Sequence, residues 1–207
     1  MIVSILGIVA LQGYWIFSAW NDKEEEFSLA VQQSLMMVAE EIQERELSDY
    51  ISAYERLVER QVEAGVDGIV PCGTTGESST LSDTEIIELV RRTIQIVNGR
   101  CAVIAGVGTN DTGRTIRLAQ EAQSLGADGG LVITPYYNKP GQEGLYAHCA
   151  AVANAAPKLP IVLYNVPGRT GVSFTVDTIV RLAQLPTVVA LKDATADMAF
   201  ASHIVAR

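Results

Sequence analysis

A lysine at the end of an apolar segment is the residue in this sequence best suited to covalent chemistry. Lys192 closes the run VVALK at 188–192. Most lysines are solvated surface charges, but one that ends a continuous apolar strand has little room to extend its ammonium group into water. Loss of solvation favours the neutral amine, which can attack a carbonyl carbon. The sequence therefore predicts a nucleophilic amine at Lys192.

Three tyrosines offer phenols that could move the protons of such a reaction. Tyr164 ends the apolar segment that precedes the one bearing Lys192, and Tyr136 and Tyr137 follow a Thr-Pro turn. Formation of an imine requires proton transfers, which a positioned phenol can relay. A tyrosine at the edge of a core with a satisfied hydroxyl is the alternative interpretation of Tyr164.

Two threonines and an arginine could bind a carboxylate. Thr74 and Thr75 lie in the Gly-flanked turn CGTTGE, where their hydroxyls and amides could hold an anion or pass a proton, or simply shape the loop. Arg169 lies in a loop rich in Pro and Gly, and its planar guanidinium suits a substrate carboxylate. The chemistry predicted from these residues is that of an amine acting on a carbonyl acid.

The elements that must position these residues alternate between short apolar strands and amphipathic helices. Continuous apolar runs are typical of parallel strands that are covered on both faces. The predicted strands are 67–71, 102–105, 130–133, 161–164 and 188–191. The predicted helices are 83–97, 112–125, 143–155 and 175–184, the first with a capping box of Ser82 and Glu85.

Right-handed crossovers leave two architectures for such a chain, a doubly wound sheet or a TIM barrel. Polar motifs follow every predicted strand, as expected at the mouth of a barrel. No GxGxxG or Walker loop opens a helix, which disfavours nucleotide binding. We therefore expect an α/β fold that forms part of a TIM (β/α)8 barrel.

Composition excludes several other classes of protein. The chain has 207 residues, of which 48% are hydrophobic and 19% charged, with a net charge of −9. Such a composition excludes disorder, and the acidic balance argues against nucleic acid as a partner. The three cysteines are far apart and there are only two histidines, so we expect neither a disulfide framework nor a metal site.

The N-terminal region differs from the rest of the chain. Residues 2–20 carry no charge and end in an aromatic cluster, which predicts a transmembrane helix over 1–21 and contact with a membrane. A signal peptide would need a basic start, and a buried core helix is the remaining alternative. Residues 22–50 predict an acidic amphipathic helix or linker. In composition, residues 1–50 resemble the membrane-entry segment of bacterial sensor histidine kinases.

Residues 51–207 resemble the 4-hydroxy-tetrahydrodipicolinate synthase (dihydrodipicolinate synthase) family. The motifs that carry the resemblance are GTTGE at 73–77, AGVGTN at 105–110, TPYYNKP at 134–140, YNVPGRTG at 164–171 and LKDAT at 191–195. The resemblance implies a pyruvate-dependent lyase of class I aldolase type in lysine biosynthesis. It also implies an incomplete barrel, with family strands two to six, and a cytoplasmic location for this segment.

The resemblance assigns roles to the catalytic candidates. It implies that Lys192 forms an imine with pyruvate and that Tyr164 donates and accepts the protons. Thr74 and Tyr137 would complete the proton relay. In this family the tyrosine matching Tyr137 serves the site of a neighbouring subunit, so the resemblance also implies a homo-oligomer.

The remaining implications concern substrates. Thr75 would bind the carboxylate of pyruvate and Arg169 would help to hold L-aspartate-4-semialdehyde, with no cofactor beyond the covalent imine. A pyruvate lyase acting on a sugar acid, similar to N-acetylneuraminate lyase, is one alternative, and the arginine at 169 favours the synthase over it. An inactive membrane-tethered fragment is the other alternative.

Overall fold

The computed structural model describes residues 23, 32–34, 36–37 and 50–207, and the chain divides into two units, Met1–Tyr54 and Glu55–Arg207. The predicted transmembrane helix over 1–21 lies outside the described residues, as does most of the predicted acidic helix over 22–50. The described residues of that second segment are helical. Within the described part of the chain, no helix has the length and apolarity needed to cross a bilayer.

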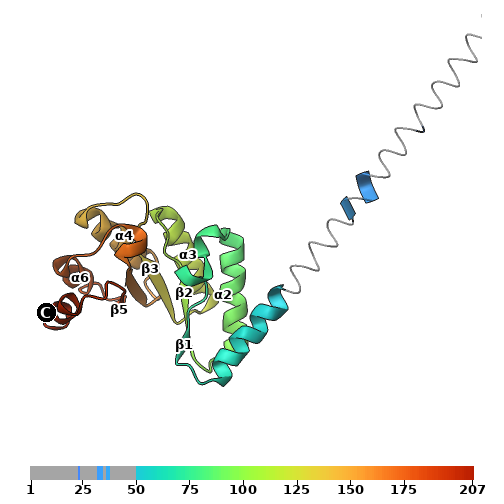
Figure 1. Cartoon of the computed structure of the whole chain (residues 1–207), viewed down its shortest axis with the longest axis horizontal. Helices are drawn as coiled ribbons and strands as arrows, with labels where there is room; N and C mark the ends of the chain where they lie inside the picture. The colour runs from blue at the N-terminus through green and yellow to red at the C-terminus, as the bar shows by residue number, and fades with distance from the viewer. Residues whose placement is uncertain (1–22, 24–31, 35, 38–49) are drawn as a thin grey trace, which may run out of the picture. The chain divides into compact units, whose positions relative to one another are not determined.

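Five parallel strands form a single sheet in the second unit. They are β1 (Gly68–Ile69), β2 (Ala102–Gly106), β3 (Gly129–Ile133), β4 (Ile161–Asn165) and β5 (Val188–Asp193). Each strand pairs with the next one along the chain, in the order β1-β2-β3-β4-β5 (Figure 1). The predicted strands are confirmed. A doubly wound sheet reverses its order at a switch point, and these five strands show no such reversal.

The four predicted helices are also confirmed. They are α2 (Asp83–Val97), α3 (Thr112–Leu125), α4 (Gln142–Ala155) and α6 (Val176–Leu182). The capping box at the start of α2 forms as predicted, because Ser82 accepts from the Glu85 amide and the Glu85 carboxylate accepts from the Ser82 amide. Sequence patterns did not predict the helix at 50–63, α5 (Pro167–Thr170), α7 (Met198–Val205) or the 3-10 turns η1 (Thr74–Gly76) and η2 (Ser78–Thr80).

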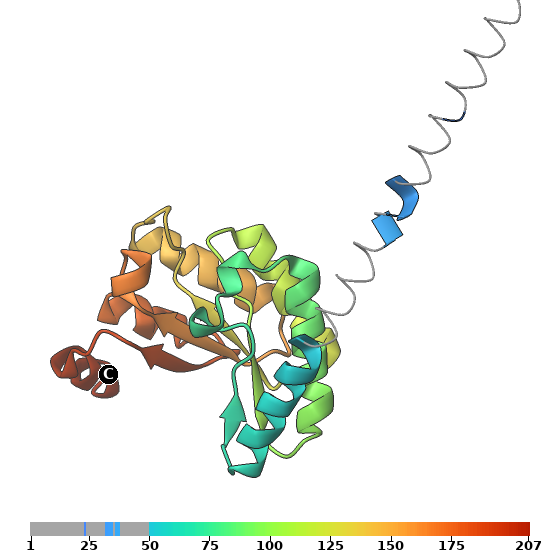
Figure 2. The same ribbon diagram turned by 45° about the vertical axis from the view of Figure 1, so that its right-hand side comes forward.

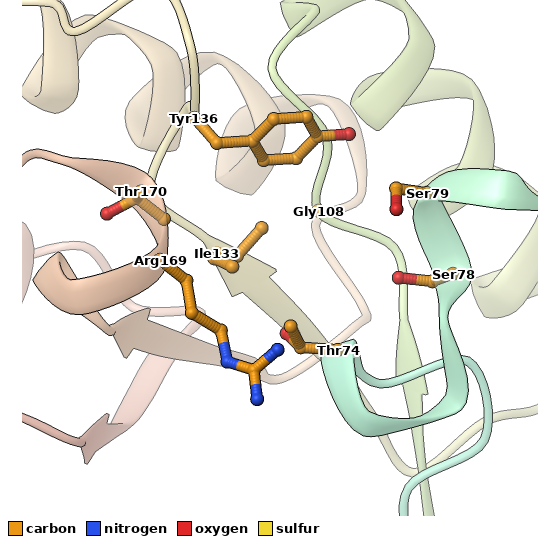
Figure 3. Close-up of a pocket in the computed structure, with 8 residues that line it drawn as sticks. All are labelled: Thr74, Ser78, Ser79, Gly108, Ile133, Tyr136, Arg169 and Thr170. Atoms are coloured by element: carbon orange, nitrogen blue, oxygen red, sulfur yellow. The ribbon is translucent and has the colours of Figure 1, made fainter.

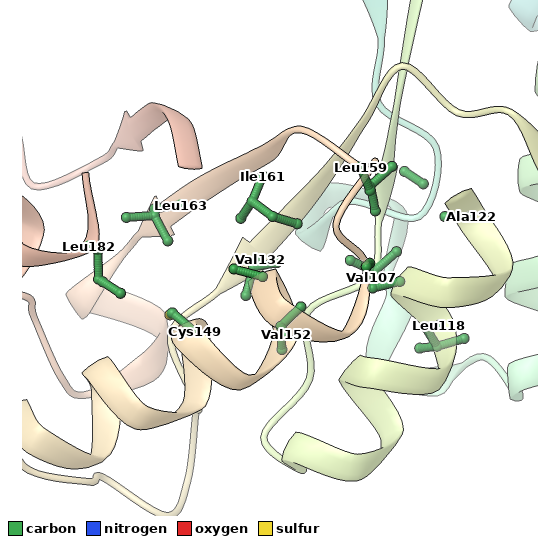
Figure 4. Packing of buried hydrophobic residues seen from close by; sticks show 14 of the residues in the cluster. Val107, Leu118, Ala122, Val132, Cys149, Val152, Leu159, Ile161, Leu163 and Leu182 are labelled. Atoms are coloured by element: carbon green, nitrogen blue, oxygen red, sulfur yellow. The ribbon is translucent and has the colours of Figure 1, made fainter. Parts of the chain in front are cut away.

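Side chains on the two faces of the sheet have different surroundings. On the helix-covered face, Val132 and Leu163 pack against Leu145 and Val152 of α4 in one continuous core (Figure 4). On the opposite face, a smaller cluster contains Leu131, Tyr164 and Val166. Because side chains alternate along a strand, Tyr164 lies on the face away from the helices, which run side by side along the other face in Figure 2.

Candidate active site

Lys192 and Tyr164 lie beside one another at the carboxyl ends of the two adjacent strands β5 and β4. They are register partners, and the Lys192 Nζ is 4.2 Å from the centroid of the Tyr164 ring. The ring is buried. Among the described residues, Lys192 Nζ has no hydrogen bond or ion pair, so the amine is not committed to a carboxylate. The amine and the phenol are thus brought together as the sequence predicted.

The expectation that Lys192 is desolvated among apolar neighbours is wrong for the described chain. Lys192 is exposed, and every residue of β5 is either exposed or half-buried. The physical reason is that, among the described strands, β5 pairs with β4 alone and its outer edge is open. The sequence correctly predicted an apolar strand and the resemblance implied an incomplete barrel, but the expectation of a desolvated amine did not take the open outer edge of β5 into account.

A cavity of about 340 Å³ opens at the carboxyl ends of β1, β2 and β3. It is lined by hydroxyl groups, one guanidinium and apolar surface, contributed by Thr74, Ser78, Ser79, Gly108, Ile133, Tyr136, Arg169 and Thr170. Figure 3 shows the Arg169 guanidinium directed toward Thr74, with the Tyr136 ring directed toward Ser79. In the part of the chain that the structure describes, the Arg169 side chain has no ion pair. A free guanidinium beside hydroxyls suits a carboxylate ligand.

Short contacts between loops give this cavity its shape. The Thr134 hydroxyl donates to the Thr170 hydroxyl at 3.0 Å, which joins the loop after β3 to the loop bearing Arg169. The amide of Gly108 donates to Leu131 at 3.1 Å, and a β-carbon added at Gly108 would overlap the Ile133 amide nitrogen. The glycine therefore allows the loop after β2 to lie directly against β3.

Of the six predicted site residues, Thr74 and Arg169 line this cavity, and Lys192, Tyr164, Thr75 and Tyr137 lie outside its lining. Thr75 is exposed next to Thr74. Tyr137 is 87% exposed and has a positive φ of 67°, an uncommon conformation for a residue with a side chain. Sequence reasoning did not single out Gly108, Ser79 or Thr170 as lining residues. The only signal for them was their place within or beside the loops that follow strands.

Burial makes Cys72 and Cys149 poor nucleophiles. Desolvation raises the pKa of Cys72, two residues before Thr74, to about 11 and that of Cys149 to about 12. Both thiols are therefore protonated at neutral pH. Within the described residues, no group of three His, Cys, Asp or Glu side chains could hold a metal ion. The described side chains here thus offer an amine beside a phenol and, in the separate cavity lining, a guanidinium among hydroxyls.

Comparisons with known proteins agree with this set of groups. The sequence profile of the dihydrodipicolinate synthetase family matches residues 36–207. The 4-hydroxy-tetrahydrodipicolinate synthase of Pelobacter propionicus is 53% identical over 149 residues, which cover 72% of this chain and 51% of that protein. The corresponding enzyme of Magnetococcus marinus is 51% identical over 156 residues.

Solved structures give the same result. The dihydrodipicolinate synthase of Acinetobacter baumannii, complexed with pyruvate, superposes with a TM-score of 0.73 at 49% identity over 75% of this chain and 53% of that one. The enzyme of Thermotoga maritima gives 0.72 at 48% identity over 75% and 53% of the two chains. The chain thus spans about half the length of the relatives that it matches. It belongs to the dihydrodipicolinate synthetase family.

Proposed function

We propose that this chain carries the imine-forming part of a 4-hydroxy-tetrahydrodipicolinate synthase, which condenses pyruvate with L-aspartate-4-semialdehyde. The observation that carries the proposal is the Lys192 amine, 4.2 Å from the centre of the Tyr164 ring and free of any carboxylate partner among the described residues. Membership of the family supports it, because relatives about half identical to this chain are named for this activity. The five strands would form part of the wall of a (β/α)8 barrel.

The reaction begins with the amine. Neutral Lys192 attacks the ketone carbon of pyruvate, and loss of water from the resulting carbinolamine leaves an imine. Removal of a proton from the pyruvate methyl group gives an enamine, whose carbon adds to the aldehyde of the second substrate. Tyr164 would pass these protons, with the Thr74 hydroxyl as the next member of the relay. Attack on the imine by the amino group of the condensed substrate then releases Lys192.

Arg169 would recognise the second substrate. Its guanidinium faces a cavity whose other polar groups are mainly hydroxyls, so it is the one charged group of that lining. A carboxylate of L-aspartate-4-semialdehyde would bind there, whereas Thr75 would hold the carboxylate of pyruvate. The position of the cavity beside β3, the strand next to Tyr164, supports this division of roles.

The exposed Tyr137 supports a homo-oligomer. Its ring is 87% exposed, so it is accessible to a neighbouring copy, and its positive φ is a strained conformation of the kind found at functional sites. We propose that Tyr137 completes the proton relay in the site of a neighbouring copy.

Trapping with borohydride tests the central proposal. Pyruvate and borohydride together should leave one reduced pyruvyl group on Lys192, found by mass spectrometry of its peptide. Lys158→Arg, at another exposed lysine, should be labelled like the parent chain, and Lys192→Arg should not be labelled. A folded chain that acquires no adduct would overturn the proposal and leave the inactive-fragment alternative.

Replacement of Arg169 tests the identity of the second substrate. Arg169→Ala should keep imine formation with pyruvate and lower the rate of condensation with the semialdehyde about 100-fold, because a charged hydrogen-bond donor is lost. Arg181→Ala, in α6, outside the lining of the cavity and paired with Glu143, is the matched control. Equal loss of pyruvate trapping and condensation would contradict the proposed role of Arg169.

A further inference from the structure

We propose that the hydrogen bond between Asn165 and Asp193 positions Lys192 against Tyr164. The proposal rests on the proposed function for its consequence in catalysis, but the positioning itself can be measured without activity. Asn165 and Asp193 directly follow Tyr164 and Lys192, and they form the next register pair of β4 and β5. Asn165 Nδ2 donates to Asp193 Oδ1 at 2.8 Å.

Few other contacts hold the Lys192 side chain in place. It is exposed on a strand with one partner among the described strands, and its contact with the Tyr164 ring is not directional like a hydrogen bond. The ladder itself is irregular at its start, because Ile161 pairs with Val188 while Val162 pairs with Ala190. A shift of one residue in β5 would turn Lys192 to the other face of the sheet.

Asn165 is fixed by several hydrogen bonds besides the one to Asp193. It is fully buried on the helix-covered side, where its Oδ1 accepts from the amide of Phe174 at 3.2 Å. The Ser173 hydroxyl lies within 3.1 Å of Nδ2 and 3.3 Å of Oδ1. The end of β4 is thus fastened to the segment that follows the Arg169 loop.

Asp193 connects the end of β5 to Asn165 and to the turn that follows β5. Its Oδ2 accepts from the Thr195 hydroxyl and from the Thr195 amide, so the turn after β5 closes on the same carboxylate. The backbone adds a bond of 2.8 Å from the Ala194 amide to the Asn165 carbonyl. Since side chains alternate, the polar pair lies on one face of the sheet and the amine and phenol lie on the other. Fixing the register of Asn165 and Asp193 therefore also fixes the register of Tyr164 and Lys192.

Asn165 and Asp193 are accordingly positioning residues, which act through Lys192 without touching substrate. The alternative is that their bond only stabilises the fold. In that case its loss would lower the melting temperature, and the geometry and reactivity of Lys192 would be unchanged in the molecules that remain folded.

Nuclear magnetic resonance of lysine side chains separates these two roles. The chain has four lysines, Lys23, Lys139, Lys158 and Lys192, so the Lys192 ε-methylene signal can be assigned with Lys192→Arg. The Tyr164 ring should shift that signal upfield in the parent chain. We expect the shift to be lost in Asn165→Asp, where two carboxylates face each other, and kept in Ser173→Ala, which removes a bond within the β4 side only.

Two further variants keep the test decisive. If Asn165→Asp does not fold, Asp193→Ala on the more exposed strand removes the same bond and should lose the same shift. The double variant Asn165→Asp with Asp193→Asn restores a donor facing an acceptor and should recover the shift. Persistence of the upfield signal in folded Asn165→Asp or Asp193→Ala would overturn the positioning role, whatever the chain does with pyruvate.

The link to reactivity is a second, separate readout. Borohydride trapping at saturating pyruvate should be about 10- to 100-fold slower in the folded single variants than in the parent chain, since small displacements of a reacting group cost that much. A parent chain that keeps the ring shift but traps no pyruvate would defeat the proposed function alone. Trapping at the parental rate in variants that have lost the shift would overturn the role of this bond in reactivity.

Discussion

The middle of the sheet and its β5 side are built differently, although both follow the same strand-helix pattern. The residues of β3 are almost all buried, with Val132 in the core on the helix-covered face and Leu131 in the smaller cluster on the other face. By contrast, β5 has no fully buried residue, and none of the residues of α7 is buried. The middle is held by packing, whereas the β5 side depends on directed hydrogen bonds such as that between Asn165 and Asp193. The amine proposed to react lies on the less packed side.

The largest difference in stability between the two regions is expected at two leucines that are register partners. Leu163 on β4 is 1% exposed and Leu191 on β5 is half-buried. Leu163→Ala should lower the free energy of unfolding by about 2–5 kcal/mol, because it leaves a cavity in a packed core. Leu191→Ala should cost roughly half as much or less. Urea unfolding of both variants measures the difference, and equal losses would mean that the two strands are supported alike.

Helix caps give a smaller effect of the same kind. Ser82→Ala at the start of α2 should lower the free energy of unfolding by about 1 kcal/mol. Asp197 caps α7 by accepting from the Ala199 and Phe200 amides, but α7 adds only partly buried side chains, Phe200 and Ile204, to the core. Asp197→Ala should therefore speed amide hydrogen exchange in α7 and change global unfolding by less than about 0.5 kcal/mol. A large global loss would show that α7 is part of the cooperative unit.

The packed middle also contains a group that should make stability depend on pH. His148 is 5% exposed, its Nδ1 is 2.9 Å from the Thr112 hydroxyl, and its Nε2 has no hydrogen-bond partner within the described chain. Burial lowers the pKa of His148 below 6.5, although the Asp111 carboxylate opposes the shift. Below pH 6.5 the unfolded chain therefore binds more protons at this residue than the folded chain does.

This difference in proton binding sets the sign of the change in stability with pH. The free energy of unfolding should fall as pH drops through 6.5 toward the lower pKa of folded His148. His148→Gln, which keeps a polar side chain near Thr112, should flatten the dependence between about pH 7 and 5.5. Unfolding curves that have the same slope in both chains would show that His148 is not the source.

The smallest effect is expected at the exposed part of β5. Val189 is 60% exposed, so Val189→Thr should change the free energy of unfolding by less than about 0.5 kcal/mol. Val132→Thr makes the same change at a fully buried position of β3 and should cost about 1–3 kcal/mol, because it buries a hydroxyl. Comparable losses in the two variants would contradict the contrast between the two regions.

Much of the fold was predictable because it depends on local periodicity. Apolar runs and caps placed all five strands and four of the helices within a few residues. Among the missed elements, α5 has four residues and η1 and η2 have three each, too few to show a period, whereas the longer helices at 50–63 and α7 were missed for another reason. The pairing of Lys192 with Tyr164 was also predictable, because parallel strands bring their carboxyl ends to the same edge of a sheet.

The sequence by itself determined the order of the elements and the chemical types at each strand end. Those features are local, since they follow from side-chain size, charge and spacing along the chain. Only the tertiary structure decided that Lys192 is exposed, that Thr75 and Tyr137 lie outside the cavity, and that Asn165 reaches Asp193. Solvent exposure and hydrogen bonding between strands depend on which segments become neighbours in space. The periodic pattern of a segment does not show which other segments will lie beside it.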